Sequence, residues 1–295
     1  MKDEETSHEK QYNADDALVK QYIEENGIDA ERDATGFYYS PIKLNPSGQL
    51  IQQKDIFYFK YKMSLLNGNV LEDKSQPSDS IQKAMHNNVA QLYGFSRSFS
   101  PQGLDLGLAY MREGEKYLFV IPSYMAYYSA SVDGFLPAYS NLAVEMEILN
   151  IVSAEEQKLI ENDTIDAYIE RASLEDVVEE TASGLHYVTT AEGTGDTPAN
   201  GKVVTVHYTG KLLDGTVFDS SINKKPLSFV IGQNNVIEGW EEGIALMKEG
   251  EKAQLIIPSH LAYYQSALEL PQSVSNVEIP PFSVLIFDVE LVDIQ

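Results

Sequence analysis

An alternation of apolar and polar residues marks the second half of the chain. In "VVTVHYTG", Val204, Val206 and Tyr208 alternate with polar or small residues, which is typical of a strand with one buried face. The pair Asp214-Gly215 follows and favours a tight turn, so this stretch predicts a β-hairpin. The segments "PLSFVIG", "KAQLIIPS" and "FSVLIFDVELVDI" are short and apolar, and they predict three further strands.

A longer period marks the segment "VIEGWEEGIALMKEGE". Trp240, Ile244 and Met247 recur at helical spacing, which places them on one face of a helix. Gly250 is the residue expected to end this helix. One helix among several strands predicts the α+β class, in which the helix packs on a strongly bent antiparallel sheet.

The first half of the chain repeats the second half. Three segments match in the same order: "YKMSLLNGNVLEDKS" with "YTGKLLDGTVFDSS", "REGEKYLFVIPSYMAYY" with "KEGEKAQLIIPSHLAYY", and "PAYSNLAVEMEILNI" with "PPFSVLIFDVELVDI". Two long copies predict tandem domains rather than a solenoid, and we place them at 1–152 and 153–295. The copies differ in length between Leu71 and Gly103 and after Tyr263, so we expect loops there.

A helical segment is expected to precede each sheet. Residues 153–184 form a strongly acidic, helix-forming run that predicts one or two amphipathic helices. Its apolar positions are Leu159, Ile165, Ile169 and Leu174. Residues 13–36 are the counterpart in the first copy, where Gly27 is expected to end the helix.

Composition narrows the classes of function. The 295 residues include 21 Lys plus Arg against 45 Asp plus Glu, which gives a net charge of −24. This excess of acid argues against nucleic acid and anionic membranes as partners, because both are bound through cationic side chains. The absence of cysteine excludes disulfides, thiolate nucleophiles and cysteine-based zinc sites. No apolar run approaches the length of a membrane span.

Few residues remain as candidates for chemistry. The sequence has no P-loop and no His-Glu-x-x-His motif, and the lone Gly-x-Gly in "EGTGDTPANG" favours a turn. The five histidines are scattered, and no nucleophile–base pair is recognisable. What remains is an aromatic set with one carboxylate: Tyr208, Phe218, Asp219, Phe229, Trp240, Tyr263 and Phe287. Spacing alone favours an ordinary aromatic core for this set.

Three segments of the second domain carry a family resemblance. "VHYTGKLLDGTVFDSS", "PLSFVIGQNNVIEGWEEGIALMKEGEKAQLIIPSHLAY" and "IPPFSVLIFDVELV" resemble the FKBP-type peptidyl-prolyl cis-trans isomerases over residues 201–295. The resemblance implies two FKBP-like domains, each a bent antiparallel β-sheet wrapped around one α-helix, with helical lead-in segments. It also implies a proline-binding pocket between the helix and the sheet, and no metal or organic cofactor.

The resemblance assigns roles to individual residues of that pocket. Trp240 would be its floor, under the bound proline ring. The walls would be Tyr208, Phe218, Phe229 and Phe287, the backbone at Val236 and Ile237 would hydrogen-bond the substrate, and Ile279 would line the rim. Asp219 and the Tyr263 hydroxyl would be the catalytic polar groups. Leu227, where the family often has an aromatic residue, departs from the pattern.

The first copy lacks this aromatic set. By alignment of the two copies, Leu71, Glu72, Leu104 and Val144 replace Phe218, Asp219, Trp240 and Phe287, while Tyr61 and Tyr127 keep their places. Aliphatic residues can maintain a core because volume and apolarity suffice for packing, but they do not supply a flat floor for a proline ring. We therefore expect the first domain to fold like the second without catalysing.

The resulting functional hypothesis is a folding enzyme whose active site lies in the second domain. The alternative is a polypeptide-binding chaperone or assembly factor with little turnover. Expected partners are proline-containing polypeptides, macrolide inhibitors and, through the first domain, a second copy of the chain. The tandem arrangement resembles envelope lipoproteins of bacteria whose signal segment has been removed, which favours a periplasmic location; a cytoplasmic location is the alternative.

Overall fold

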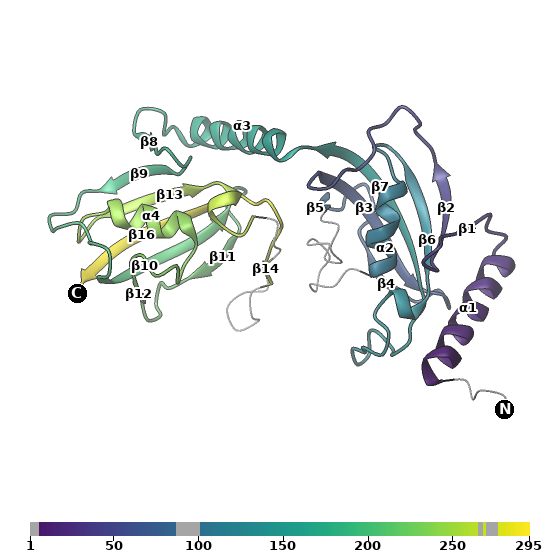
Figure 1. The fold of residues 1–295 in the computed structure, drawn as a ribbon. Helices are drawn as coiled ribbons and strands as arrows, with labels where there is room; N and C mark the ends of the chain where they lie inside the picture. Colours follow the sequence, from purple (N-terminus) through teal and green to yellow (C-terminus); the bar gives the residue numbers. More distant parts are fainter. Residues whose placement is uncertain (1–5, 87–100, 265–267, 270–276) are drawn as a thin grey trace. The chain divides into compact units, whose positions relative to one another are not determined.

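The computed structural model describes residues 6–86, 101–264, 268–269 and 277–295. The chain divides into two compact units, Met1–Ala154 and Glu155–Gln295, which Figure 1 shows as two separate sheets, each with its own helices. Both predicted insertions fall largely outside the described residues. No helix within the described ranges is both long and apolar enough to cross a bilayer.

The first unit consists of a lead-in helix and one sheet with a short helix. Its elements are α1 (Ser7–Glu25), β1 (Glu31–Arg32), β2 (Tyr38–Lys43), β3 (Ile56–Leu65), β4 (Val70–Asp73), β5 (Gln82–Met85), α2 (Gln102–Gly107), the 3₁₀ helix η1 (Leu108–Tyr110), β6 (Lys116–Ile121), the 3₁₀ helix η2 (Ser123–Met125) and β7 (Leu142–Val152).

The second unit has the same succession of main elements. They are α3 (Ala154–Ala172), β8 (Val178–Glu180), β9 (His186–Ala191), β10 (Val203–Leu212), β11 (Val217–Ser220), β12 (Leu227–Val230), α4 (Glu238–Leu246), β13 (Lys252–Ile257), the 3₁₀ helix η3 (Ser259–Leu261), β14 (Leu268–Glu269), β15 (Glu278–Ile279) and β16 (Leu285–Ile294). Here, however, β13 follows α4 directly, and two short strands, β14 and β15, precede the last strand.

The two main sheets have one topology. Strand order is β4-β3-β7-β6-β2-β1 in the first unit and β11-β10-β16-β13-β9-β8 in the second, and β5 and β12 pair with β3 and β10 respectively. All of these pairings are antiparallel. The α+β prediction with two equivalent bent sheets is therefore confirmed.

β-Bulges occur at the same places in both sheets. The register between β3 and β7 shifts at Tyr58/Phe59, and that between β10 and β16 shifts at Thr205/Val206. A bulge adds a residue to one strand and increases the local bend and twist. Both sheets therefore bend at matching places. Each curves around a helix on its concave face, α2 in one unit and α4 in the other (Figure 1).

Glycine allows these helices to approach the sheet closely. A Cβ atom at Gly243 of α4 would lie 2.7 Å from Leu255 Cδ1 on β13. At the matching place in the first unit, a Cβ atom at Gly107 would lie 2.5 Å from Phe119 Cε1. Both distances are shorter than van der Waals contact, so a larger residue would push the helix off the sheet and open the core beneath it.

The lead-in helices differ from the sequence prediction in their bounds and in their buried faces. α1 begins at Ser7, earlier than predicted, because Thr6 and Glu9 form a capping box. It ends one residue before its C-cap Asn26, and Gly27 follows with φ +61°, as predicted. α3 is a single helix that buries Ile165 and Ile169.

Two helix predictions were wrong in detail. Leu159 is 63% exposed, because the buried face of α3 is completed by polar residues instead. Gly250 does not end α4: the helix stops at Leu246, and Met247 turns inward with extended backbone (φ −75°, ψ 146°). Met247 is fully buried, so packing ends the helix there, and Gly250 (φ +83°) serves the turn into β13.

Candidate functional site

A small cavity in the second unit brings together most of the predicted site residues. Its volume is about 180 Å³, and its lining comes from β10, β11, β12, α4, β16, the approach to α4 and the turn after η3. The lining residues are Tyr208, Phe218, Asp219, Leu227, Asn235, Val236, Ile237, Trp240, Tyr263 and Phe287. The site therefore lies between the helix and the concave face of the sheet.

Trp240 is the centre of the aromatic lining. It lies in the first turn of α4, where its backbone N–H donates to the Ile237 carbonyl at 2.9 Å. The rings of Tyr208 and Phe287 meet it edge-on, at centroid distances of 5.0 and 5.1 Å and interplanar angles of 80° and 85°. This T-shaped geometry is the favourable one for aromatic pairs, and it fixes the indole plane as one flat surface of the cavity.

Asp219 is held by hydrogen bonds on both of its oxygens. Oδ2 accepts the Tyr208 hydroxyl at 2.5 Å, and Oδ1 accepts the N–H of Ser220 at 2.8 Å. Burial, together with this hydrogen bond and the carboxylate charge, raises the pKa of Tyr208 above its ordinary value. The Tyr208 phenol is therefore a neutral donor that Asp219 holds in one orientation.

Tyr263 contributes a second hydroxyl to the cavity. It follows η3 and is half-buried. Burial first, and then the negative charge of Asp219, raise its pKa. The phenol therefore stays protonated across the physiological range and can donate a hydrogen bond to a carbonyl in the cavity.

The structure brings eight of the ten predicted residues to the cavity and leaves two outside its lining. Phe229 is 6% exposed and packs against Trp240 at a centroid distance of 6.1 Å, so it supports the floor. Ile279 is 1% exposed and belongs to the core cluster. Sequence reasoning missed Leu227 and Asn235 as lining residues. Leu227 had been noted only as a departure from the family pattern.

The first unit fills two of the corresponding positions with buried aliphatic side chains. Leu104, which aligns with Trp240, and Val144, which aligns with Phe287, are fully buried. Tyr61 is 1% exposed, whereas its counterpart Tyr208 is half-buried at the cavity wall. At these positions core side chains therefore lie where the second unit has Trp240, Phe287 and Tyr208. Tyr127 remains, and burial raises its pKa to about 12.

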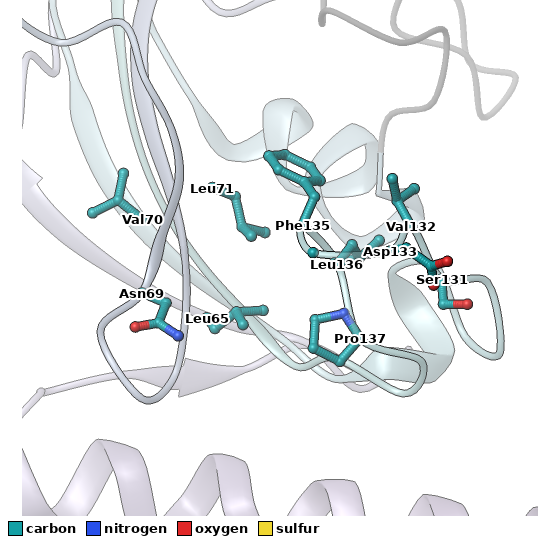
Figure 2. Close-up of a pocket in the computed structure, with 11 residues that line it drawn as sticks. Leu65, Asn69, Val70, Leu71, Ser131, Val132, Asp133, Phe135, Leu136 and Pro137 are labelled. Carbon is teal, nitrogen blue, oxygen red and sulfur yellow. The ribbon is translucent and has the colours of Figure 1, made fainter.

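A larger cavity in the first unit lies beside these packed positions. Its volume is about 520 Å³, and it lies between the β3–β4 hairpin and the loop 131–137. Figure 2 shows Leu65 and Leu71 on the hairpin side and Phe135, Leu136 and Pro137 on the facing loop. Leu71 aligns with Phe218 and Leu136 aligns with Ile279, so the cavity adjoins the place of the missing pocket without the aromatic floor.

The chemistry available at these sites is that of hydrogen bonds and apolar contacts. Among the described residues, no three His, Asp or Glu side chains lie close enough to hold a metal ion. The cavity of the second unit offers two phenol hydroxyls, one carboxylate and the backbone at the start of α4. Such a lining can desolvate and orient a polypeptide carbonyl.

Comparison with known proteins gives one family. The family model for FKBP-type peptidyl-prolyl cis-trans isomerases matches residues 48–149 and 195–292, that is, both sheets. The chain is 44% identical over 130 residues to the probable FKBP-type peptidyl-prolyl cis-trans isomerase FkpA of Neisseria meningitidis, a match that covers 44% of this chain and 44% of the relative.

Two further matches are of the same kind. The FKBP-type 22 kDa peptidyl-prolyl cis-trans isomerase of Escherichia coli is 44% identical over 128 residues, which cover 43% of this chain and 58% of the relative. The crystal structure of FkpA from Escherichia coli is 36% identical, covers 48% of this chain and 63% of that chain, and has a TM-score of 0.38. The matched part spans about half the length of these curated relatives.

Proposed function

The chain belongs to the family of FKBP-type peptidyl-prolyl cis-trans isomerases, and from this premise we propose that it catalyses cis–trans isomerisation of X-Pro bonds in polypeptides. We place the active site in the cavity of the second unit and assign no catalysis to the first. The observation that carries this assignment is the contrast between the aromatic cavity around Trp240 and the buried aliphatic residues Leu104 and Val144, which stand in the first unit at the places of Trp240 and Phe287.

The reaction needs no nucleophile. Rotation about an X-Pro bond faces a barrier of about 20 kcal/mol, because amide resonance must be broken. The planar amide is the more dipolar form, and the twisted transition state loses that charge separation. A cavity that replaces water around the amide with aromatic rings therefore disfavours the planar form relative to the twisted one.

Each polar group of the cavity has a role in this scheme. The Tyr263 hydroxyl and the backbone at Val236 and Ile237 hold the carbonyls of the substrate, while the proline ring lies on Trp240. Asp219 orients the Tyr208 hydroxyl, with which it is hydrogen-bonded. Phe218 and Phe287 form the apolar walls, with Phe229 behind Trp240 and Ile279 behind the rim.

The test compares matched tyrosines in the full chain. We expect Tyr263→Phe to lower kcat/KM for an X-Pro peptide by about tenfold, the cost of one lost hydrogen bond near 1.4 kcal/mol. Tyr127→Phe, at the same place of the first unit, should leave turnover unchanged. Equal losses in the two variants would place catalysis in both units. A folded wild-type protein without turnover would favour the chaperone alternative.

Macrolide inhibitors are expected to occupy the same cavity. Trp240 is the one tryptophan of the chain, so its fluorescence reports on this cavity alone. Titration with a macrolide or a proline-containing peptide should change that fluorescence in a saturable way. Saturable binding with an unchanged spectrum would show that the ligand lies elsewhere.

A second candidate function, binding of extended polypeptide without turnover, is favoured by the cavity of the first unit (Figure 2). A further cavity of about 440 Å³ shares Leu65 and Pro137 with it, and we call the surface around both cavities the groove. Val70 and Phe135 in this groove are 51% and 37% exposed. Apolar side chains of an unfolded chain can pack against these two residues.

Polar substitution in the groove tests this second function. Phe135→Ser should weaken protection of an unfolded protein against aggregation and leave X-Pro turnover unchanged. Ile42→Ser, at a residue that is 53% exposed on β2 outside the groove, is the control. If Phe135→Ser instead changes only the molecular mass measured by light scattering, the groove binds a second copy of the chain.

Location in the cell envelope stays a prediction from the tandem arrangement. Fractionation of the source cells, followed by detection of the protein in periplasmic and cytoplasmic extracts, would decide between the two locations.

A further inference from the structure

The lead-in helix of the second unit is joined to the turn that carries Tyr263 by a buried carboxylate. Glu161 on α3 accepts the N–H of Ser259 at 2.9 Å through Oε2 and the Ser259 hydroxyl at 2.8 Å through Oε1. Gln157, one turn earlier, donates its amide to Oε1 at 3.0 Å. The three residues are 5%, 1% and 1% exposed, so water does not compete for these hydrogen bonds.

Ser259 in turn holds both neighbours of Tyr263. Its carbonyl accepts the N–H of Ala262 at 2.9 Å and that of Tyr264 at 2.9 Å. Tyr264 has a φ of +49°, a left-handed conformation that a non-glycine residue adopts only when its surroundings enforce it. The backbone around Tyr263 is therefore strained, and Ser259 is the point at which α3 fixes it.

We propose that Glu161 is a positioning residue for Tyr263, so that helix α3 is a functional part of the isomerase domain. α3 lies in the part of the chain between the two segments that the family model matches, so the family assignment gives it no role. Glu161 contacts no substrate in this proposal; it acts by fixing Ser259 and, through it, the direction of the Tyr263 hydroxyl. The inference rests on the proposed isomerase activity.

The first unit contains the same device without the active site, which makes it a matched control. Asp15 on α1 accepts the Ser123 hydroxyl at 2.6 Å and the Gln11 amide at 2.8 Å. Asp15 and Ser123 are both fully buried. Because aspartate is one methylene shorter than glutamate, the N–H of Ser123 is served by Asn141 Oδ1 at 2.7 Å instead.

The neutral amide variants separate positioning from folding. In Glu161→Gln the side chain keeps its size but loses its charge, so the charge-assisted hydrogen bonds to Ser259 weaken, and the Ser259 hydroxyl and the Gln157 amide must reorient to meet the new amide donor. We expect kcat/KM for an X-Pro peptide to fall by about tenfold, mainly through kcat, since small displacements of a catalytic group are costly. Asp15→Asn should destabilise the first unit to a similar degree and leave turnover unchanged.

A double-mutant cycle tests whether the effect passes through Tyr263. In a Tyr263→Phe background, Glu161→Gln should cause no further loss of turnover, because the hydroxyl that it positions is already absent. Losses that multiply would show that Glu161 acts on the whole domain, and they would overturn the positioning role.

Rescue uses the arrangement of the first unit. Val284 is the counterpart of Asn141, because each residue precedes the leucine that begins the last strand of its sheet. Glu161→Asp alone should impair turnover, since the shorter carboxylate cannot reach both Ser259 donors. Adding Val284→Asn supplies an acceptor for the Ser259 N–H and should restore part of the loss.

If Glu161→Gln does not fold, a second pair of variants repeats the test: Ser259→Ala, with Ser123→Ala as its control. The former should lower turnover and the latter should not. If the wild-type protein is active, and folded Glu161→Gln and Ser259→Ala are equally active, this inference alone is overturned. Absence of activity in folded wild-type protein would overturn the proposed function and this inference together.

Discussion

Asp105 should destabilise the first unit at neutral pH. It lies on α2 and is 6% exposed, and its Oδ1 accepts no hydrogen bond within the part of the chain that the structure describes. Burial raises its pKa from 3.8 to about 6. The folded state therefore binds more protons than the unfolded state between these two values, and stability falls as the pH rises through that window.

The size of the effect follows from the shift. At about 1.4 kcal/mol per pKa unit, roughly two units correspond to about 3 kcal/mol of destabilisation above pH 6. Asp105→Asn removes the charge but buries an amide with an incomplete set of partners, which costs about 1–2 kcal/mol. We therefore expect a net gain of about 1–2 kcal/mol at pH 7.5 and no gain at about pH 2.5, where Asp105 is protonated in both states.

The counterpart of Asp105 in the second unit is the control. Glu241 Oε2 accepts the N–H of Gly232 at 2.7 Å, and the amide oxygen of Glu241→Gln can accept it as well, so this variant should change the stability of its unit by less than about 1 kcal/mol. Urea unfolding of the full chain, followed by near-UV circular dichroism of tyrosine and by fluorescence of Trp240, separates the two units. A pH-independent effect of Asp105→Asn, or a loss of stability at pH 7.5, would refute the reasoning.

Three further predictions concern the second unit. Trp240→Leu should lower turnover at least about tenfold and cost about 2–4 kcal/mol of stability, because it removes two edge-to-face ring contacts and leaves a void; urea unfolding and the peptide assay measure both. Tyr208→Phe should lower turnover several-fold at nearly unchanged stability, because the half-buried Asp219 loses a donor but stays hydrated; an unchanged rate would remove the orienting role of Asp219. Gly243→Ala should cost about 1–3 kcal/mol by overpacking against Leu255, and a neutral result in thermal unfolding would show that α4 can shift outward.

The fold was predictable from the sequence because its signals are local. Alternation in "VVTVHYTG" and helical spacing around Trp240 reflect burial on one face of β10 and α4. The internal repeat shows each of these signals twice, since the order of the main elements has to be the same in both halves. The end of α4 was not predictable in this way, because Met247 leaves the helix in order to fill the core, and that is a tertiary effect.

The site was predictable only as far as a resemblance reached. It gave the aromatic lining, but it could not show that Phe229 and Ile279 lie behind the surface rather than on it. The hydrogen bonds of Glu161 were beyond any pattern in the sequence. Glu161 lies 98 residues before Ser259. From the sequence alone, a glutamate in an acidic helical run is expected on the solvated face of the helix, and only its distant partner shows that it is buried.

The two units separate the requirements of the fold from those of the site. Both keep the bulges, the close glycine contacts of α2 and α4 and a buried carboxylate that anchors the turn after the sixth strand. They differ where Trp240, Phe218 and Phe287 are replaced by aliphatic residues. Since the shared features maintain the shape of the sheet in the absence of a pocket, they cannot by themselves indicate activity. These three pocket positions can, because a packed core has no need of an open aromatic floor, and an isomerase does.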